Sequence, residues 1–461
     1  MDLFFDILLT LELLNPFQAF WLVFINGGWI ILAIVLIKGL WFLWLDEIQG
    51  GYASELQFMM LAINVPRQTE QSPKAVENIF AHLTGLGGGG GNLVDKYWKG
   101  KFQEQFSCEI VSRSGYIQYF VYLPSKYRDV LEASIFAQYP DAEIAEVTDY
   151  LDEMPKSWPD ERYDMWGAEL ALSKSYAYPI KTHPGFVDQV SGLLKDPLSS
   201  MLEFLSTLRP GEEAYIQFAL RPTGDDWRET CLKEINKLIG AKVEEKKSEF
   251  QKFIGKILNP LYGIIEEILP FLKIIVEKKE GKEEPPNKMQ YLPPGDRSVV
   301  EQISIKASKP AFTTKIRLMY VAPKEIFNKS RASGGLMGSF KQVSTMDMNS
   351  FATEKFTKLS ADYFFVEQRI LKKQNAMWAA FRGRSLGCGG TPYVLNVEEL
   401  ATLWHFPMID TKAPLVSKAT SKQAEPPSSL PVRDMPEYGP GITLPPLEEK
   451  KDELPENLPF V

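Results

Sequence analysis

The sequence predicts a mixed α+β protein that is attached to one long apolar helix near its N-terminus. Residues 17–45 are apolar and carry no charge between Phe17 and Ile37. Downstream, β-rich segments alternate with amphipathic helical segments in the order β-α-β-β-α-β, which is typical of an α+β sandwich. Together these two observations predict a membrane-attached α+β protein.

The length and the charge balance are those of an ordinary folded protein with room for several domains. The chain has 461 residues, 24% of them charged, and a formal net charge of −8. A negative net charge argues against a general polyanion binder. The three cysteines, Cys108, Cys231 and Cys388, are far apart and form no CxxC pair, which suits a reducing compartment better than a disulfide framework.

Residues 17–45 are predicted to form a transmembrane helix. At about 1.5 Å per residue the uncharged part covers roughly 30 Å, the hydrocarbon thickness of a bilayer. Trp21 near one end, and Trp41 and Trp44 near the other, match the aromatic belts found at headgroup level. A cleaved signal peptide would need a basic leader and a small-residue cleavage site, whereas this leader is acidic. A buried core helix is the other alternative, and the length of the run disfavours it.

The charges that flank this run predict its orientation. Residues 1–16 contain acidic but no basic side chains and are spaced as an amphipathic helix that lies in the membrane interface. Lys38, Arg67 and Lys74 follow the span, so the positive-inside rule places the N-terminus outside and the body in the cytoplasm. We therefore expect a single-pass protein that contacts membrane lipid.

The first predicted domain covers residues 55–150. Residues 55–65 form a strand, and Ser72 and Pro73 begin a helix that runs to Leu83. The remaining predicted elements are strands at 106–113 and 116–123, joined by a Ser-Gly turn, a helix at 125–138 and a strand at 142–147. This order is that of a ferredoxin-like sandwich.

The second predicted domain covers residues 160–345 and contains a helical insertion. Its predicted elements are strands at 167–178, 213–221 and 312–321, a helix that starts at Asp196-Pro197 and a helix at 294–306. This order partly matches a second ferredoxin-like unit. The insertion, residues 225–279, has a broad apolar face interrupted by Pro270. It is interpreted as a buried helical hairpin, with a contact between subunits of a homo-oligomer or a touch on the membrane surface as alternatives.

Residues 346–407 are predicted to be a helical region with a closing segment. Just before this region, a break in helical structure is expected at Ser333-Gly334-Gly335. Within the region, a helix is expected at 355–381. Basic and aromatic side chains gather near the end of that helix: Arg369, Lys372, Lys373, Trp378, Arg382 and Arg384. Because bases stack on aromatic rings while cations follow phosphates, these residues are a candidate nucleic-acid patch, although a solvated helix face is the simpler interpretation.

Residues 408–461 change character, with proline recurring among Lys, Glu and Ser and almost no apolar periodicity. Such a composition cannot bury enough apolar surface to fold, so a disordered or extended tail is predicted.

The sequence carries no catalytic motif that points to an enzyme. It has no GxxxxGK[ST], and the glycine-rich runs at 85–91 and 334–339 lack the lysine that reaches phosphates. His82, His183 and His405 are scattered, without cysteine or carboxylate partners at metal-ligand spacing. Cys388, in GCGG, has no sequence-local partner to lower its pKa. The prediction is a protein without enzymatic activity, cofactor or metal.

The block LNVEELATLWHFP, residues 395–407, is distinctive. Asn396 is placed to cap a short helix, and Glu398 and Glu399 suit its N-terminal dipole. Trp404 and Phe406 add apolar contacts, so these two rings and the two glutamates form a candidate partner contact.

The block resembles the segment just before the ATPase core in TraG-like, membrane-anchored coupling ATPases of type IV secretion and conjugation in candidate-phyla bacteria. Other stretches resemble the same family: SPKAVENIFAHL, FSCEIVSRSG, EASIFAQYPDAEIAEVTDY and EEAYIQFALRP. In long members a P-loop ATPase follows a PP-x-x-LP stretch like the one at 426–431, whereas here the sequence given stops at Val461.

This resemblance implies an inner-membrane scaffold that docks or regulates a separate P-loop translocation ATPase in the bacterial cytoplasm. Two alternatives stay open. One is a membrane-anchored module that binds the transferred DNA through its basic patch, and the other is a cryptic hydrolase in one of the α+β domains.

Overall fold

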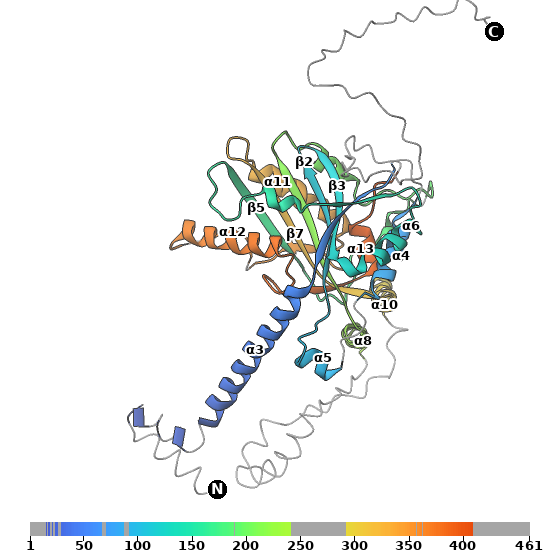
Figure 1. The fold of residues 1–461 in the computed structure, drawn as a ribbon. Helices are drawn as coiled ribbons and strands as arrows, with labels where there is room; N and C mark the ends of the chain where they lie inside the picture. Colours follow the sequence, from blue (N-terminus) through green and yellow to red (C-terminus); the bar gives the residue numbers. More distant parts are fainter. Residues whose placement is uncertain are drawn as a thin grey trace, which may run out of the picture. The chain divides into compact units, whose positions relative to one another are not determined.

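A single antiparallel sheet organises the protein. The computed structural model describes residues 15, 17–18, 21, 24–25, 29–66, 71–86, 92–188, 190–240, 292–355, 357–361 and 363–408. Within these ranges nine strands join one sheet, so the predicted α+β class is confirmed (Figure 1). Most of the predicted 1–16 helix, of the 225–279 insertion and of the 408–461 tail lies outside the described residues.

Seven of the nine strands lie in the two predicted domains, and β8 and β9 lie in the predicted closing region. The first four are β1 (Phe58–Asn64), β2 (Phe106–Arg113), β3 (Tyr116–Pro124) and β4 (Glu143–Val147). The others are β5 (Tyr163–Leu172), β6 (Glu213–Pro222), β7 (Ala311–Pro323), β8 (Phe351–Thr353) and β9 (Tyr393–Asn396).

The sheet runs without interruption through both predicted domains. Its order is β4-β1-β3-β2-β6-β7-β5-β8, and β9 pairs with the beginning of β7. Counted from the outer edge of the sheet toward its middle, each half therefore places its first four strands in the order fourth, first, third, second. The halves meet at β2 and β6, which pair antiparallel over their whole length, from Phe106 opposite Leu220 to Arg113 opposite Glu213.

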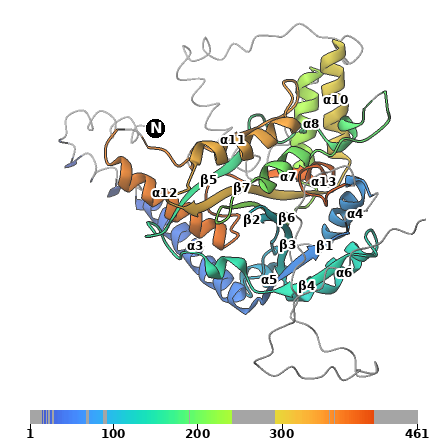
Figure 2. The same ribbon diagram turned by 90° about the horizontal axis from the view of Figure 1, so that it is seen from above.

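Five helices pack against one face of the sheet and close a large apolar core. They are α4 (Pro73–Leu83), α6 (Arg128–Phe136), α7 (Ser199–Ser206), α11 (Lys329–Phe340) and α13 (Val397–Leu403). In Figure 2, α4 and α13 lie side by side near β1. The strands alternate as expected for a sheet buried on both sides, since Leu61 enters this core and Met60 points to the other face.

The opposite face is covered mainly by α12 (Val366–Arg382) and by the short helix η3 (Tyr150–Glu153). Trp378 and Phe381 of α12 pack there with Trp158, Tyr215 and further apolar side chains. A third cluster joins α8 (Trp227–Leu238) to α10 (Pro294–Ala307). We refer to the two sides of the sheet as the five-helix face and the α12 face.

The N-terminal helix α3 (Trp29–Glu55) contains the second half of the predicted 17–45 span. Most of its described apolar side chains are exposed. Among the described helices, none meets the combined requirements of length and apolar character for crossing a bilayer. The predicted span begins at Phe17, and several residues of 17–28 are not described.

Two boundaries inside the second half differ from the prediction. Strand β5 covers residues 163–172 rather than 167–178, because Asn349 holds the following residues away from the sheet. Its amide donates to the carbonyls of Ser175 and Tyr178 at 2.9 and 3.0 Å. The helix predicted from Asp196-Pro197 begins slightly later, as α7, and Asp196 accepts a hydrogen bond from the Leu198 N–H at 2.6 Å.

The predicted break at residues 333–335 is wrong, because α11 continues through it. A Cβ on Gly335 would lie only 2.1 Å from the Phe204 ring, so glycine here permits α7 and α11 to approach closely. The predicted 355–381 helix starts only at Val366. Phe365 before it has a φ of 53°, a left-handed conformation that interrupts a helix.

Candidate functional site

The site with the most polar chemistry lies where α3 joins the sheet. Tyr52 Oη donates a hydrogen bond to Glu104 Oε1 at 2.6 Å, and Lys126 Nζ donates to the same oxygen at 2.6 Å. The hydrogen bond to Glu104 raises the pKa of Tyr52. Burial disfavours the charge of Lys126, but the bond to Glu104 outweighs it and raises the pKa of that lysine. One buried carboxylate thus fixes the base of α3 to the body.

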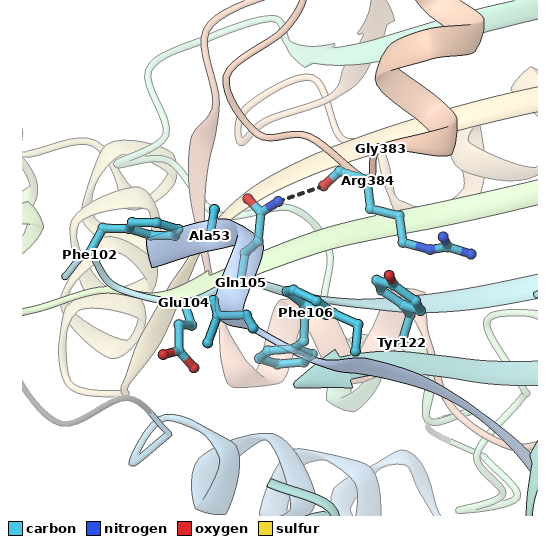
Figure 3. A pocket seen from close by; sticks show the side chains of 10 residues that line it. Ala53, Phe102, Glu104, Gln105, Phe106, Tyr122, Gly383 and Arg384 are labelled. Carbon is cyan, nitrogen blue, oxygen red and sulfur yellow. Dashed lines mark hydrogen bonds between the residues drawn. The ribbon is translucent and has the colours of Figure 1, made fainter. Parts of the chain in front are cut away.

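A cavity of about 180 Å³ opens beside this carboxylate. Aromatic rings of Phe58, Phe102, Phe106 and Tyr122 contribute to its wall, and Glu104, Gln105 and Arg384 are its polar lining residues (Figure 3). Gln105 Nε2 donates to the Arg384 carbonyl at 3.1 Å, which links the two sides of the cavity. Typical small-molecule sites enclose roughly 300–1,000 Å³, so the cavity suits waters or a very small ligand rather than a nucleotide.

Arg384 connects the cavity to the α12 face. Its side chain is only 4% exposed and forms ion pairs with Glu109, at 2.9 Å, and with Asp149, at 2.7 Å. The guanidinium also lies 4.0 Å from the centre of the Tyr122 ring. Although burial disfavours the charge, the neighbouring Glu109 and Asp149 carboxylates hold the pKa of Arg384 above its ordinary value. Arg384 is therefore a fixed cation held by Glu109 on β2, Tyr122 on β3 and Asp149 just before η3.

A row of polar side chains crosses four strands of the α12 face in register. Glu109 on β2 is opposite Gln217 on β6, Gln217 is opposite Arg317 on β7, and Arg317 is opposite Glu169 on β5. Gln217 Nε2 donates to Glu109 Oε1 at 3.0 Å, and Arg317 donates to Gln217 Oε1 at 3.3 Å. We refer to these four residues as the polar row. All four side chains are buried.

The segment after α12, residues 383–390, covers the polar row. Lys315 Nζ donates to the carbonyls of Leu386 and Cys388 at 2.8 and 2.9 Å, and Arg317 donates to the Ser385 and Cys388 carbonyls. Gly390 N–H donates to Glu169 Oε2 at 2.9 Å. Burial lowers the pKa of both Lys315 and Arg317, and the nearby Glu169 carboxylate opposes this effect.

These contacts show that the polar row positions a loop. Arg317 of the row and the neighbouring Lys315 donate to backbone carbonyls, and Glu109 accepts further hydrogen bonds from Ser107 and Tyr150 at 2.8 and 2.7 Å. Within the residues that the structure describes, no group of three or more His, Cys, Asp or Glu side chains could hold a metal ion. The arrangement supports a pre-formed rigid surface next to α3, because the buried charges are held by partners.

The structure separates the residues of the predicted nucleic-acid patch. Arg369 and Lys372 are exposed on α12, and Arg382 is half-buried. Lys373 Nζ donates to the carbonyls of Lys358 and Ser360, while Trp378 is buried and donates to the Pro155 carbonyl at 2.8 Å. Arg384 is the buried cation described above. Arg369 and Lys372 therefore remain as the exposed cations of the six.

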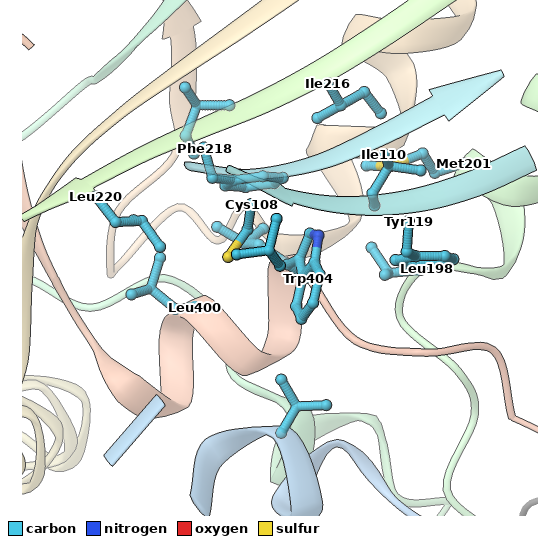
Figure 4. Close-up of a cluster of buried hydrophobic side chains, with 14 of the residues drawn as sticks. Cys108, Ile110, Tyr119, Leu198, Met201, Ile216, Phe218, Leu220, Leu400 and Trp404 are labelled. Atoms are coloured by element: carbon cyan, nitrogen blue, oxygen red, sulfur yellow. The ribbon is translucent and has the colours of Figure 1, made fainter. Parts of the chain in front are cut away.

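The four predicted partner-contact residues lie in the interior. Glu399 forms a buried ion pair with Lys306 at 2.8 Å and completes the capping box with Asn396. Glu398 pairs with Lys309. The rings of Trp404 and Phe406 pack into the five-helix face, which Figure 4 shows for Trp404. All four side chains contact other residues of this chain. A role for these residues in binding a partner stays a prediction.

Sequence reasoning missed the polar row, although a signal for it is visible. Four strands carry polar or charged residues within apolar stretches, in the contexts CEIV, IQFA, KIRL and AELA. A charge in the middle of a buried strand must find a partner across the sheet. That rule marks Glu109, Gln217, Arg317 and Glu169 as neighbours. It does not reveal the strand order that brings them together.

The fold and the site define a mixed α+β protein with one continuous antiparallel sheet and an apolar N-terminal helix fixed beside the start of β2 and the end of β3. Residues 73–419 match the family described as "Domain of unknown function (DUF8128)", and the chain belongs to this family. The match starts at the first residue of α4 and includes the polar row and the LNVEELATLWHFP block. No curated protein matches the chain.

Proposed function

We propose that this protein is a membrane-anchored scaffold whose anchor consists of residues 17–45. The exposed surface of α3 carries this proposal. Residues 34–37 and 40–43 are two runs of four consecutive large apolar side chains, and all eight are between 47% and 68% exposed. Successive residues are about 100° apart around a helix, so each run covers all sides. A water-exposed helix would show a polar face, whereas a helix that is apolar all round suits a membrane.

The surroundings of α3 support an orientation with the body in the cytoplasm. Lys38 lies in the C-terminal half of the predicted span, and the next basic residues along the chain are Arg67 and Lys74. The positive-inside rule then places this end of the helix on the cytoplasmic side. In the bacterial setting that the family resemblance implies, this membrane is the inner membrane.

We further propose that each half of the sheet is a ferredoxin-like unit. In both halves the strands follow the spatial order fourth, first, third, second, which that fold requires. In the second half the insertion that contains α8 lies between β6 and β7, so it lengthens the central hairpin of the unit. The pairing of β2 with β6 would then join two similar units into one platform.

The proposed activity is to dock or regulate a P-loop translocation ATPase of the type IV secretion and conjugation kind. This step rests on the resemblance to TraG-like proteins. The stretches that carry the resemblance form α4, β2, α6 with β4, β6 and α13. These elements build the sheet and the helices that cover it. A shared fold would therefore account for the sequence similarity between this chain and the TraG-like proteins.

A second candidate, binding of the transferred DNA, is favoured by one specific surface. Tyr363, Phe364 and Phe365 are exposed just before α12, and Arg369 and Lys372 are exposed on its first turns. Exposed rings next to cations can stack bases and follow phosphates. Retention of the protein on single-stranded DNA that falls steeply with salt would favour this function over the scaffold.

The hydrolase alternative has weaker support from the site. It would need paired carboxylates with raised pKa values in a pocket. The cavity beside Arg384 is lined by one carboxylate, Glu104, which is hydrogen-bonded to Tyr52 and Lys126.

Purification of the full chain from membranes in a mild detergent tests the scaffold function. We expect a P-loop ATPase of the translocation type to co-purify and to be identified by mass spectrometry, and we expect the protein itself not to hydrolyse ATP. Deletion of residues 412–461, which occupy the position where the long TraG-like proteins connect to their ATPase, should weaken this co-purification. Dilute detergent conditions are needed because confinement to one membrane raises the effective concentration of both proteins. ATP turnover that survives extensive purification would contradict the proposal.

A further inference from the structure

A short turn beside α3 has the composition of a membrane-surface element. It comprises residues 92–101 and contains the helix α5 (Leu93–Tyr97), and we refer to it as the α5 turn. Asn92 caps the helix by accepting a hydrogen bond from the Asp95 N–H at 2.9 Å, and the Lys101 N–H closes the turn on the Asp95 carbonyl at 2.9 Å. The turn therefore has a defined shape.

The α5 turn packs directly on the C-terminal half of α3. The ring centres of Trp41 and Tyr97 are 5.6 Å apart, and those of Trp44 and Trp98 are 6.0 Å apart. Gly100 has a φ of 66°, and a Cβ at this position would lie 2.4 Å from the Ile48 carbonyl oxygen. Only glycine allows this close approach of the turn to the helix backbone.

This contact places the turn at the level where α3 would leave the hydrocarbon. Trp41 and Trp44 belong to the predicted interfacial aromatic belt. From Trp41 to Ile48 a helix rises about 10 Å, and the headgroup layer of one leaflet is roughly 5–8 Å thick. The α5 turn therefore lies along the stretch of α3 that would cross the headgroup layer.

The outward side of the turn is apolar and basic. Leu93 is 75% exposed and Trp98 is 76% exposed, and Val94 is exposed as well. Three lysines against one aspartate leave a net charge of +2 on residues 92–101. Lys99 pairs with Asp95 at 2.9 Å, and this hydrogen bond lowers the pKa of Asp95. Surfaces that combine exposed apolar side chains with lysines typically bind at the boundary between lipid headgroups and acyl chains.

From these contacts we infer that the α5 turn is a second membrane contact, which binds the headgroup layer of an anionic bilayer beside the anchor. The occupant is lipid, because the exposed side chains continue the apolar surface of α3 at the same level. The lysines add attraction to acidic headgroups. The inference rests on the proposed anchor, since only an inserted α3 holds the turn at the membrane surface. A consequence is that the body is fixed against the membrane at two points instead of swinging from one helix.

Fluorescence quenching in proteoliposomes tests this inference. The full chain with Cys388→Ser, which removes the exposed cysteine and leaves the two buried ones, receives a single new cysteine labelled with an environment-sensitive dye. Leu93→Cys reports on the α5 turn, Phe42→Cys reports on the anchor, and Tyr116→Cys reports on the exposed turn between β2 and β3. The vesicles contain phosphatidylcholine with phosphatidylglycerol, and lipids spin-labelled near the headgroup act as quenchers.

We expect the Leu93 and Phe42 probes to be quenched and the Tyr116 probe to remain accessible to water. Quenching at Phe42 with a water-exposed Leu93 probe would overturn the inference and leave the anchor intact. A water-exposed Phe42 probe would overturn both.

A charge variant provides a second readout that does not alter the apolar side chains. Replacing Lys96, Lys99 and Lys101 by Gln should weaken the interaction of the turn with phosphatidylglycerol vesicles by roughly fivefold per lysine, and quenching of the Leu93 probe should fall accordingly. The matched control replaces three exposed lysines elsewhere, Lys233, Lys329 and Lys341, and should leave this quenching unchanged. Equal quenching in both triple variants, or equal quenching of the parent in pure phosphatidylcholine, would contradict the role of the lysines.

Discussion

The two faces of the sheet are built on different physical principles. The five-helix face is closed by apolar side chains from α4, α6, α7, α11 and α13, with ionic pairs near the ends of α4 and α13. The α12 face carries the polar row and Lys315 beneath the 383–390 segment, and Arg384 of that segment pairs with Glu109. Apolar packing tolerates small shifts, whereas a buried charge row fixes one register and one loop position. We infer that the first face supplies most of the stability and the second defines the surface next to α3.

The largest effect is expected on the five-helix face. Trp404→Ala removes a buried ring that contacts Phe80, Tyr119 and Phe406, and it leaves a cavity. We expect a loss of about 4 kcal/mol in the free energy of unfolding, measured by urea denaturation in mild detergent. Met346→Ala, at an exposed site, should change stability by less than about 0.5 kcal/mol. Similar losses for both variants would contradict the assignment of Trp404 to the core.

A slightly smaller loss is expected on the α12 face. Arg384→Met leaves the Glu109 carboxylate buried without its cation, which should cost about 3 kcal/mol. Adding Glu109→Gln to this variant should restore part of the loss, since the uncompensated charge is gone. No second substitution should restore Trp404→Ala in this way. If the double variant is as unstable as the sum of the two single ones, the charge pairing is not the reason for the loss.

The ionic pairs of the five-helix face predict an acid-dependent loss of stability. Burial alone would raise the pKa of Glu77, but hydrogen bonds with His183, Lys309 and Lys74 lower it to about 2. The folded protein therefore favours the carboxylate. The resulting stabilisation is complete above the ordinary glutamate pKa near 4.5 and is lost as the pH falls toward 2.

We expect roughly 2–3 kcal/mol of unfolding free energy to be lost across this pH interval through Glu77. Denaturation curves of the parent and of Glu77→Gln check this when they are measured from about pH 6.5 to about pH 2.5, roughly two units on each side of the ordinary pKa of 4.5. The Gln variant should be less stable at neutral pH and should show a flatter acid dependence. Parallel curves would show that Glu77 is not the responsible group.

The smallest effect is expected from the loop above the polar row. Gly389 has a φ of 98°, and a Cβ there would lie 2.2 Å from Glu169 Oε2. Gly192 has a φ of 68° in open space. Both alanine variants pay for the left-handed backbone, but only Gly389→Ala displaces Glu169. We expect Gly389→Ala to destabilise the protein by about 1–2 kcal/mol more than Gly192→Ala in thermal unfolding. Equal losses would mean that the loop does not rest on Glu169.

Local patterns in the sequence predicted the elements that depend on local chemistry. The hairpin of β2 and β3, the helix α4 with Pro73 in its first turn, and the N-cap Asn396 of α13 are all confirmed. In each case the information lies within a few neighbouring residues. The break predicted at 333–335 failed because the contact of Gly335 with Phe204 is tertiary, and glycine preference alone cannot reveal it.

The site could be predicted only in part, for the same reason. The apolar run of α3 and the basic residues of α12 are visible in the sequence. The polar row depends on β2 and β6 being neighbours although about a hundred residues separate Glu109 from Gln217. Arg384 appeared as a surface cation because the sequence just before it is rich in basic residues, whereas its partners Glu109 and Asp149 lie far away in sequence. Whether a charged side chain such as Arg384 is buried depends on partners that are distant in sequence, and the local composition does not reveal them.

Membrane flotation after alkaline carbonate treatment tests the central claim most directly. The full chain, expressed in a bacterium, is separated on a density gradient after carbonate has stripped peripheral proteins from the membranes. Because residues 34–37 and 40–43 expose apolar side chains on all sides of α3, we predict that the protein floats with the lipid. A variant with Val35→Asp and Leu36→Asp should lose this association, while Tyr116→Asp on the body should keep it. Release of the parent protein into the soluble fraction would contradict the anchor and the scaffold function built on it.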